Sequence, residues 1–438
     1  MLFSKQRFNG GANIPHRKNT SKCETVKLDV PEKVFIPMLQ HIGVPCEPTV
    51  KKGDIVKVGQ VLGKSDAYVS SPVHSSVSGT VTDVSSKLYA SGDHVTTVEI
   101  QSDGNQEIHE EVTPPVYSNK SEFLEVIRKS GLVGLGGAGF PAHVKLSPPP
   151  EKIIDTLIIN GAECEPYITS DYREIMENSW NIMCGIEILL ELMHFKNIWI
   201  GIEDNKPEAI KVLSDMANNH NNINVIKLKS RYPQGAEKML IYSVTGRKVP
   251  PGRLPSDVGV IVMNVNSVSF IAEHIKTGMP LIKKKVTVDG SAVKNPSNVE
   301  VLIGTPLIDV FNFCGGFKSE PGKVLMGGPM MGIAQYSLQT SVLKHTNALL
   351  AFNESEAVLP SESVCIRCGK CVRACPMNLL PLSINQGVIY SDIEVLNNYH
   401  VMDCIECGSC SYVCPAKRQL VQSLRLGKNM VRQAASNK

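Results

Sequence analysis

Eight of the thirteen cysteines fall into two copies of one spacing, Cys-x2-Cys-x2-Cys-x3-Cys-Pro. This spacing is typical of bacterial two-cluster ferredoxins, in which three cysteines of a run hold one [4Fe–4S] cube and the fourth binds the other cube. The pattern therefore predicts single-electron transfer through two clusters. The expected ligand sets are Cys365, Cys368, Cys371 and Cys414 for one cluster, and Cys404, Cys407, Cys410 and Cys375 for the other.

Zinc binding and disulfide bonding are the alternative uses of these cysteines. A structural zinc site takes four ligands, commonly as two Cys-x2-Cys pairs, so each run would carry surplus cysteines. Disulfide frameworks are typical of small secreted chains, whereas this chain has 438 residues. The doubled spacing favours iron–sulfur ligation.

A glycine-rich stretch, Gly134-Leu-Gly-Gly-Ala-Gly-Phe-Pro141, follows a predicted helix over 121–130. A Rossmann dinucleotide loop would lie between a strand and a helix, so that context is missing. Glycines nevertheless let backbone N–H groups approach a phosphate or a planar ring, and Lys145 adds a point charge nearby. The segment predicts an anion or cofactor loop, with a simple packing loop as the alternative.

Polar residues stand where predicted strands end. Helical and strand patterns alternate over 183–193, 198–202, 207–216 and 225–228, which predicts an α/β domain. Ligands bind at the carboxyl ends of strands in such domains. The candidate residues at these ends are Asn160, Glu163, Glu165, Glu237, Asn264 and Asn266.

Composition and charge exclude several classes of function. The net charge of +3 does not indicate a nucleic-acid partner. The longest apolar runs fall far short of the roughly 18 residues that span a bilayer. The first residues lack the apolar core of a signal peptide, so we expect a reducing cytoplasm. Both ends of the chain are basic, either as solvated tails or as docking sites for an acidic partner or a membrane surface.

The motifs together resemble known flavoproteins. The glycine stretch with Lys145, the segment 160–166, the segment 232–238 and Asn264-Val-Asn266 are similar to the FMN and NADH site of the 51-kDa flavoprotein of respiratory complex I. Gln40-His-Ile-Gly43, Ser71-Pro-Val-His-Ser75 and the paired cysteine runs are more similar to the RnfC proteins of Rnf ion-translocating ferredoxin:NAD oxidoreductases. This second resemblance covers nearly the whole chain.

The resemblance implies a multidomain protein of α/β and α+β class. We expect an N-terminal β-rich barrel with a lipoyl-like hammerhead over 1–115, and an α/β domain for FMN and NADH over 116–280. An SLBB β-grasp module over 281–345 and a helical ferredoxin-like domain with two [4Fe–4S] clusters and a basic tail over 346–438 would follow. The hammerhead stretch 66–70 has no lysine, so the barrel is expected to be structural and not a swinging carrier arm.

The resemblance also assigns roles to residues. Gly134, Gly136, Gly137, Gly139 and Lys145 would hold the phosphate and ribityl chain of FMN, and Asn160, Glu163, Asn264 and Asn266 would line the flavin. Phe140, Glu165 and Glu237 would meet the nicotinamide nucleotide. No catalytic side chain is expected beyond flavin protonation, because the cofactors carry the chemistry.

The implied function is electron transfer between NADH, FMN and two [4Fe–4S] clusters in a membrane-bound Rnf complex. Partners would be the other proteins of the complex, especially an RnfB-like iron–sulfur protein, with peripheral attachment at the cytoplasmic face of the cell membrane. The first alternative is a soluble NADH-dependent flavin and iron–sulfur reductase, such as a corrinoid reductase or a proline reductase electron donor. The second is a ferredoxin-like scaffold without its own flavin.

Overall fold

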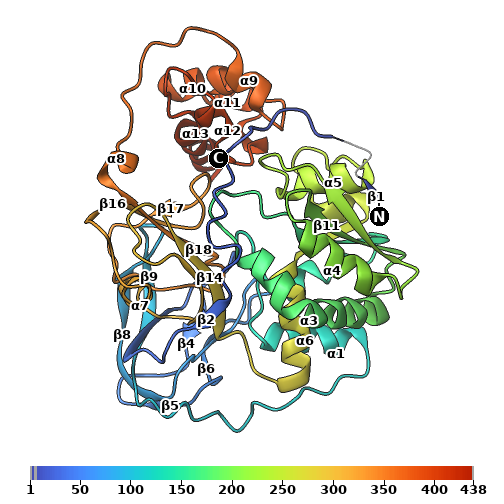
Figure 1. The fold of residues 1–438 in the computed structure, drawn as a ribbon, viewed down its shortest axis with the longest axis vertical. Helices are drawn as coiled ribbons and strands as arrows, with labels where there is room; N and C mark the ends of the chain where they lie inside the picture. The colour runs from blue at the N-terminus through green and yellow to red at the C-terminus, as the bar shows by residue number, and fades with distance from the viewer. Residues whose placement is uncertain (1, 4–6, 437–438) are drawn as a thin grey trace.

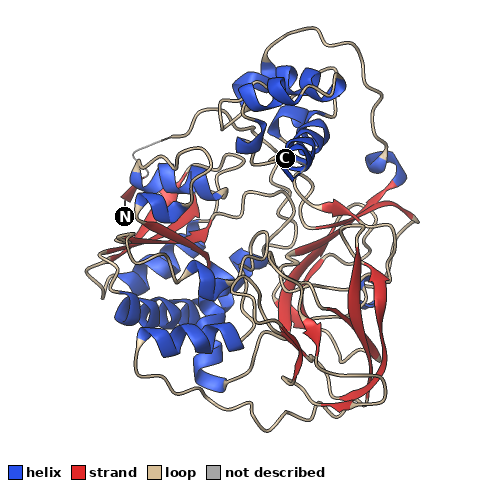
Figure 2. Ribbon diagram, turned by 180° about the vertical axis from the view of Figure 1, so that it is seen from behind, coloured by secondary structure: helices blue, strands red, loops and turns tan. Residues whose placement is uncertain are grey.

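The computed structural model describes residues 2–3 and 7–436. Figure 1 shows a β-rich half on one side, an α/β half on the other, and a helical C-terminal unit above both. Figure 2, seen from behind, separates the strands of the first half from the helix-covered sheet of the second. No helix in the described part of the chain has both the length and the apolar composition to cross a membrane.

The α/β half is built on a five-stranded parallel sheet with the order β1-β12-β11-β10-β13. Its strands are short apolar runs because helices cover both faces. One face packs against α3, α4 and α6, and the other packs against α5. The strands are β1 (Leu2–Phe3), β10 (Thr156–Gly161), β11 (Asn197–Glu203), β12 (Ile223–Leu228) and β13 (Val260–Asn264). The helices are α1 (Lys120–Lys129), α2 (Ala142–Lys145), α3 (Ser170–Met193), α4 (Pro207–Ala217), α5 (Glu237–Thr245), η1 (Pro255–Val258) and α6 (Val265–Thr277).

The β-rich half contains a barrel and a β-grasp module. The barrel joins the sheets β3-β9-β8-β5 and β4-β6-β7 around one apolar core, and the β-grasp module has a six-stranded sheet of order β17-β16-β18-β14-β15-β2. The barrel strands are β3 (Lys33–Pro37), β4 (Glu47–Pro48), β5 (Ile55–Val56), β6 (Val61–Lys64), β7 (Val73–His74), β8 (Gly79–Leu88) and β9 (His94–Ser102). The module comprises β2 (Thr25–Lys27), β14 (Lys283–Asp289), β15 (Ser297–Leu302), α7 (Leu307–Phe313), β16 (Pro321–Met326), β17 (Ile333–Ala334) and β18 (Ala348–Asn353), followed by α8 (Glu354–Ala357).

The helical C-terminal unit carries both cysteine runs. Its helices are α9 (Lys370–Ala374), α10 (Pro381–Ile389), α11 (Ile393–Asn398), η2 (Val401–Asp403), α12 (Ser409–Tyr412) and α13 (Leu420–Ser436). The basic stretch expected as a tail is the helix α13. Two of its basic side chains bind Glu406, Arg425 at 3.1 Å and Lys428 at 2.6 Å. These two charges therefore hold α13 against the second cysteine run.

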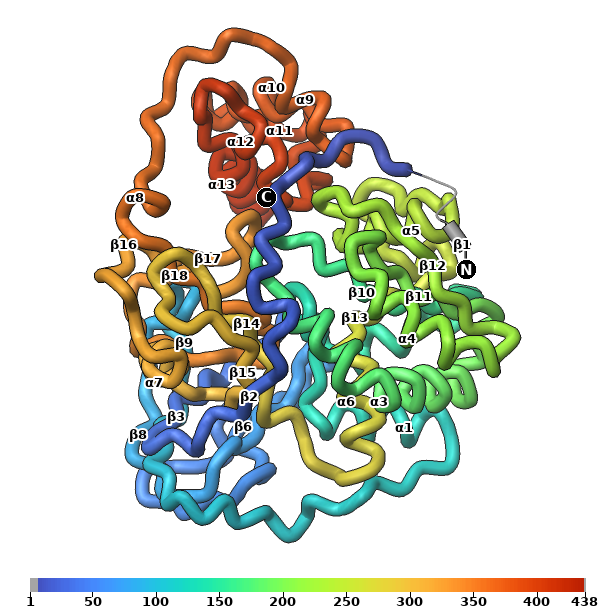
Figure 3. The backbone as a smooth tube through the Cα atoms, in the orientation of Figure 1, coloured from blue at the N-terminus to red at the C-terminus, as the bar shows by residue number. Residues whose placement is uncertain are grey.

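The N-terminal segment links all three units (Figure 3). β1 pairs with β12 in the α/β sheet, and β2 pairs with β15 in the β-grasp sheet. Between them, the backbone N–H of Gly11 donates to the carbonyl of Ala374 in the C-terminal unit at 2.8 Å. The strands of residues 2–27 thus lie outside the barrel, while the boundary expected at residue 115 stays a prediction.

Candidate functional site

The two cysteine runs fold into the same backbone shape. The residue directly before the second cysteine has a left-handed conformation in each run, Arg367 at φ 55° and Glu406 at φ 57°. Gly369 and Gly408, which follow the second cysteine, are also left-handed, at φ 72° and 75°. Left-handed residues curl a chain tightly, and glycine adopts this conformation at little steric cost. Each run therefore curls tightly over its first three cysteines.

The second run shares a pocket with the last cysteine of the first run. Cys375, Cys404, Cys407 and Cys410 all line this pocket, together with apolar side chains such as Leu424. Within the described chain, no three His, Cys, Asp or Glu side chains converge on a position for a single metal ion. Four thiols around a mainly apolar pocket fit the requirements of an iron–sulfur cube.

The charges around each sulfur agree with crossed ligation. Burial and, to a smaller extent, the charges of the neighbouring Cys404, Cys407 and Cys375 raise the pKa of Cys410 to about 12. In the other group, burial raises the pKa of Cys371, and the charges of Cys414 and Cys365 add to that rise. The fourth cysteine of each run thus lies near cysteines of the other run, and the crossed ligand sets stay a prediction.

Polar side chains meet at the carboxyl edge of the parallel sheet. Asn160 at the end of β10 lies opposite Asn264 at the end of β13. Asn264 caps α6 and donates from its amide to Asp171 at 2.7 Å, and Asn266 donates to the other oxygen of Asp171 at 2.6 Å. Asp171 is not among the predicted site residues, although its position shortly after Glu163 and Glu165 could have indicated that it belongs to the site. The structure makes it the residue that orients both asparagines.

The glycine loop lies against this network. Gly136, Gly137 and Ala138 form its exposed tip, and a side chain at Gly136 would place its Cβ 2.3 Å from the amide nitrogen of Asn264. A Cβ at Gly137 would meet no atom within 4 Å. The loop therefore presents bare backbone to open space beside Asn264, which suits the approach of a cofactor.

The remaining predicted residues of the loop differ in their exposure and contacts. The N–H of Gly134 donates to the carbonyl of Phe140 at 2.9 Å, which closes the loop, and Gly139 is buried with φ 71°. Phe140 is half-buried. Lys145 binds the carboxylate of Glu237 at 2.9 Å and the carbonyl of Val262 at 3.1 Å. Lys145 and Glu237 are thus brought together as one partly exposed ion pair.

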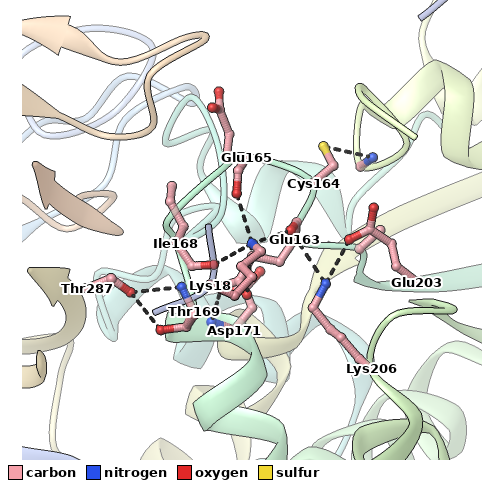
Figure 4. A network of polar contacts seen from close by, with 12 residues as sticks. Lys18, Glu163, Cys164, Glu165, Ile168, Thr169, Asp171, Glu203, Lys206 and Thr287 are labelled. Atoms are coloured by element: carbon pink, nitrogen blue, oxygen red, sulfur yellow. Dashed lines mark hydrogen bonds and ion pairs between the residues drawn. The ribbon is translucent and has the colours of Figure 1, made fainter. Parts of the chain in front are cut away.

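Lys18 holds the loop after β10 in shape (Figure 4). Its ammonium donates to the carbonyl oxygens of Glu163 at 2.7 Å and Glu165 at 2.8 Å, and also to Ile168. Burial raises the pKa of the Glu163 carboxyl to about 7, while the charge of Lys18 opposes the rise. The sequence groups Lys18 only with the basic N-terminus, because nothing in it relates this lysine to a loop about 145 residues later.

Glu165 lies beneath a loop of the β-grasp module, residues 327–332. Its carboxylate accepts from the N–H of Met330 at 3.1 Å, and a Cβ at Gly328 would come within 2.3 Å of it. A Cβ at Gly408 in the second cysteine run would lie 3.0 Å from the carbonyl of Met330. The loop 327–332 therefore fills the space between Glu165, in the loop after β10, and the second cysteine run.

Tyr232 makes a direct contact between the same two sites. Its hydroxyl donates to the carbonyl of Cys407 at 2.7 Å, and burial raises its pKa well above the usual value. The backbone of Tyr232 also pairs with Ala12 of the N-terminal segment. The α/β half and the cysteine unit are thus joined through one buried side chain.

Four family models match the chain in sequence order. They are the RnfC barrel sandwich hybrid domain over 6–105, the Nuo51 FMN-binding domain over 127–273, the SLBB domain over 285–334 and a 4Fe-4S dicluster domain over 357–415. The RnfC protein of the proton-translocating ferredoxin:NAD(+) oxidoreductase complex of Clostridium ljungdahlii is 44% identical over 98% of this chain and 94% of that protein. The chain belongs to the RnfC family of ion-translocating ferredoxin:NAD(+) oxidoreductase complexes.

Other members of the RnfC family are similarly related. The member from the Na(+)-translocating complex of Acetobacterium woodii is 45% identical, and the alignment covers 97% of each chain. The member from Rhodobacter capsulatus is 38% identical over 97% of this chain and 82% of that protein. Among solved structures, an NAD+-reducing [NiFe]-hydrogenase in the H2-reduced state matches with a TM-score of 0.48 and 15% identity, over 72% of this chain and 61% of that chain.

Membership of the RnfC family confirms the predicted fold class, with barrel, FMN-binding, SLBB and dicluster domains in that order. The cofactor prediction is likewise confirmed at the level of domains, one for FMN and one for two 4Fe-4S clusters. The exposed glycine tip, the paired asparagines and the cysteine-lined pocket fit these groups. The individual ligand residues stay predictions.

Replacing Glu165 with glutamine should stabilise the protein at high pH. Burial raises the pKa of Glu165 to about 7, so the folded state retains a proton that the unfolded state loses above about pH 4.5. Below that pH, Glu165 makes its full contribution to the free energy of unfolding. This contribution falls as the pH rises to about 7, by about 3 kcal/mol in total. Glutamine keeps an acceptor for the N–H of Met330 without this loss.

Thermal melts of the two proteins without cofactors measure the effect. The melting temperature of Glu165→Gln should approach that of the wild type at pH 5 and exceed it at pH 8. An identical difference at both pH values would contradict the predicted titration.

Proposed function

We propose that this chain is the electron-transfer component of a membrane-bound ion-translocating ferredoxin:NAD(+) oxidoreductase complex, in which it passes electrons between NADH and two [4Fe–4S] clusters. The observation that carries the proposal is the contact between the two sites. Tyr232, shortly before Gly235 and Glu237 in the chain, donates to Cys407 in the second cysteine run at 2.7 Å. The proposed flavin site and the proposed cluster site would therefore be adjacent in one molecule.

FMN supplies the conversion between a two-electron hydride and single electrons, which neither a nicotinamide nor a cluster performs alone. The chain contributes binding, orientation and exclusion of water. We assign the phosphate and ribityl chain to the backbone of the glycine loop and to Lys145, and the flavin ring to the strand-end residues. The proposed FMN residues are Gly134, Gly136, Gly137, Gly139, Lys145, Asn160, Glu163, Asn264 and Asn266.

We assign the nicotinamide nucleotide to Phe140 and Glu237, which both retain some exposure. Glu237 is bound to Lys145, so a ribose hydroxyl would have to share its carboxylate with that ammonium. Glu165 is the third proposed contact. One of its carboxylate oxygens accepts from the N–H of Met330, and the other is buried without a partner among the described residues. We assign that second oxygen to the nucleotide.

The surface around the first cysteine run is the proposed docking site for a partner. Cys368 is exposed, and the neighbouring Val364 and Ile366 are 84% and 70% exposed. Arg367 and Lys370 add positive charge beside them. Apolar and basic groups around a cluster suit an acidic iron–sulfur partner. We propose that an RnfB-like protein binds here, and that such partners hold the chain at the cytoplasmic face of the membrane.

Purification of the native complex through a tagged chain tests the function. The chain separated from the complex should carry about eight irons and one FMN, on the basis of two [4Fe–4S] clusters, whereas the complex also contains the iron of its partner. NADH should be oxidised with an artificial electron acceptor. An isolated chain that is folded and loaded with iron but takes up no FMN would overturn the proposal.

The variant Val364→Asp/Ile366→Asp tests the docking surface separately from electron transfer. It should retain iron, FMN and NADH oxidation with the artificial acceptor, and it should lose the iron–sulfur partner during purification. An unchanged yield of that partner would reject the proposed docking surface and leave the electron-transfer function standing.

A further inference from the structure

Three consecutive lysines of β14 have different surroundings. Lys283 pairs with Glu273 and Glu300, and Lys285 pairs with Glu174 and Glu177. Lys284 lies between them and points the other way, because side chains alternate along a strand. It is only 4% exposed, and in the described part of the structure its ammonium has no hydrogen-bond acceptor.

The carboxylates whose charges act on Lys284 come from α3 and from the loop before it. Burial lowers its pKa to about 8, and the carboxylates of Asp171, Glu174 and Glu163 oppose the fall. The ammonium is therefore still protonated at neutral pH. Asp171 is the first of these carboxylates, and its two oxygens accept from Asn264 and Asn266. The charge of Lys284 therefore acts on the carboxylate that holds both asparagines, one of which lies against the glycine loop.

His345 extends this arrangement to the loop itself. Its Nδ1 atom is buried without a partner among the described residues, and lies 3.3 Å from where a Cβ of Gly139 would be. Burial lowers the pKa of His345 to about 4, and the charge of Lys284 contributes to the fall. The neutral imidazole therefore lies beside the loop, and the charge of Lys284 acts on it. Both come from the β-grasp module.

A buried ammonium without an acceptor is costly, and such groups persist where a ligand completes them. The phosphate side of the site already has a cation, because Lys145 lies beside Glu237 and Val262. The charge of Lys284 acts instead on Asp171, which holds Asn264 and Asn266. Lys145 and Lys284 therefore interact with different groups, so they would serve different parts of a cofactor in this site.

We propose that Lys284 is a positioning residue of the flavin site, whose ammonium donates to an oxygen or nitrogen acceptor at the pyrimidine end of the FMN ring. The inference rests on the proposed function. A cation beside the ring attracts the electron-rich reduced form more strongly than the oxidised form. Lys284 therefore raises the midpoint potential of the flavin, and the β-grasp module completes a site otherwise built by the α/β half.

Lys284→Gln is the test variant, and Lys283→Gln is the control on the same strand. Binding of FMN and of riboflavin to the flavin-free protein is measured by fluorescence quenching, and the midpoint potential by redox titration. Lys284→Gln should bind both ligands about tenfold more weakly and should lower the two-electron midpoint potential. A tenfold greater loss for the reduced form corresponds to about 30 mV. Lys283→Gln should change neither quantity.

The possible results separate the alternatives. Weaker binding of FMN with unchanged binding of riboflavin would place Lys284 at the phosphate and overturn the ring assignment. Unchanged binding and potential in a folded variant would overturn the proposal and show a purely structural residue. Lys284→Met, of similar length without charge, takes the place of Lys284→Gln if that variant does not fold. Failure of the wild type to bind FMN would reject the proposed function itself.

Discussion

Replacing Cys375 with serine should remove the cluster that Cys404, Cys407 and Cys410 hold, although Cys375 belongs to the other run. The side chain of Cys375 lines the same pocket as these three cysteines. Loss of one thiolate from four leaves a cube without its full ligand set. The iron content should fall from about eight to about four per chain, with the electron paramagnetic resonance signal of one cluster retained.

Cys414→Ser is the matched variant because it should remove the other cluster. The charge of Cys414, like that of Cys365, raises the pKa of Cys371, so Cys414 acts on the first run. Cys184→Ser, in α3, should leave both clusters in place. If Cys375→Ser abolished the signal of the cluster held by Cys365, Cys368 and Cys371, each run would hold its own cluster and the crossed arrangement would be wrong.

Replacing Gly136 with alanine should prevent stable binding of FMN. The new Cβ would lie 2.3 Å from Nδ2 and 2.8 Å from Cγ of Asn264, so the asparagine must leave its position. It then loses its 2.7 Å hydrogen bond to Asp171. The displaced asparagine would also lose its proposed contact with the flavin, so we expect roughly 10- to 150-fold weaker binding of FMN in a fluorescence titration, which corresponds to about 1.5–3 kcal/mol.

A double-mutant cycle isolates the cause of this loss. If the steric conflict with Asn264 is responsible, Gly136→Ala/Asn264→Ala should bind FMN no more weakly than Asn264→Ala alone. Additive losses would mean that the glycine acts through its own backbone and not through the asparagine. The melting temperature of each variant reports whether the fold survives.

Local patterns in the sequence predict the parts of the molecule that depend on near neighbours. The cysteine spacing predicts the ligand sets, and the alternation of helices and strands over 183–228 matches α3, β11, α4 and β12. Asn264 and Gly136 are both predicted site residues. Their direct contact was not predictable, because it depends on how a loop before β10 lies against the end of β13.

The residues that the sequence did not reveal act across long separations. Lys18, Lys284 and the loop 327–332 reach the site from other units of the chain. A lysine in a basic N-terminus or in a run of three lysines has the pattern of a solvated surface. Only the fold shows that both lysines are largely buried. Backbone carbonyls surround Lys18, and carboxylates act on Lys284.

The N-terminal segment has a consequence for how the chain is made. Protein synthesis makes this segment before its partners in β12, β15 and at Ala374. The segment can therefore complete its pairing only after Ala374 has left the ribosome. The last cysteines appear at the same stage. Closure of the segment over the finished units and delivery of iron to the cysteines thus belong to the same late period of maturation.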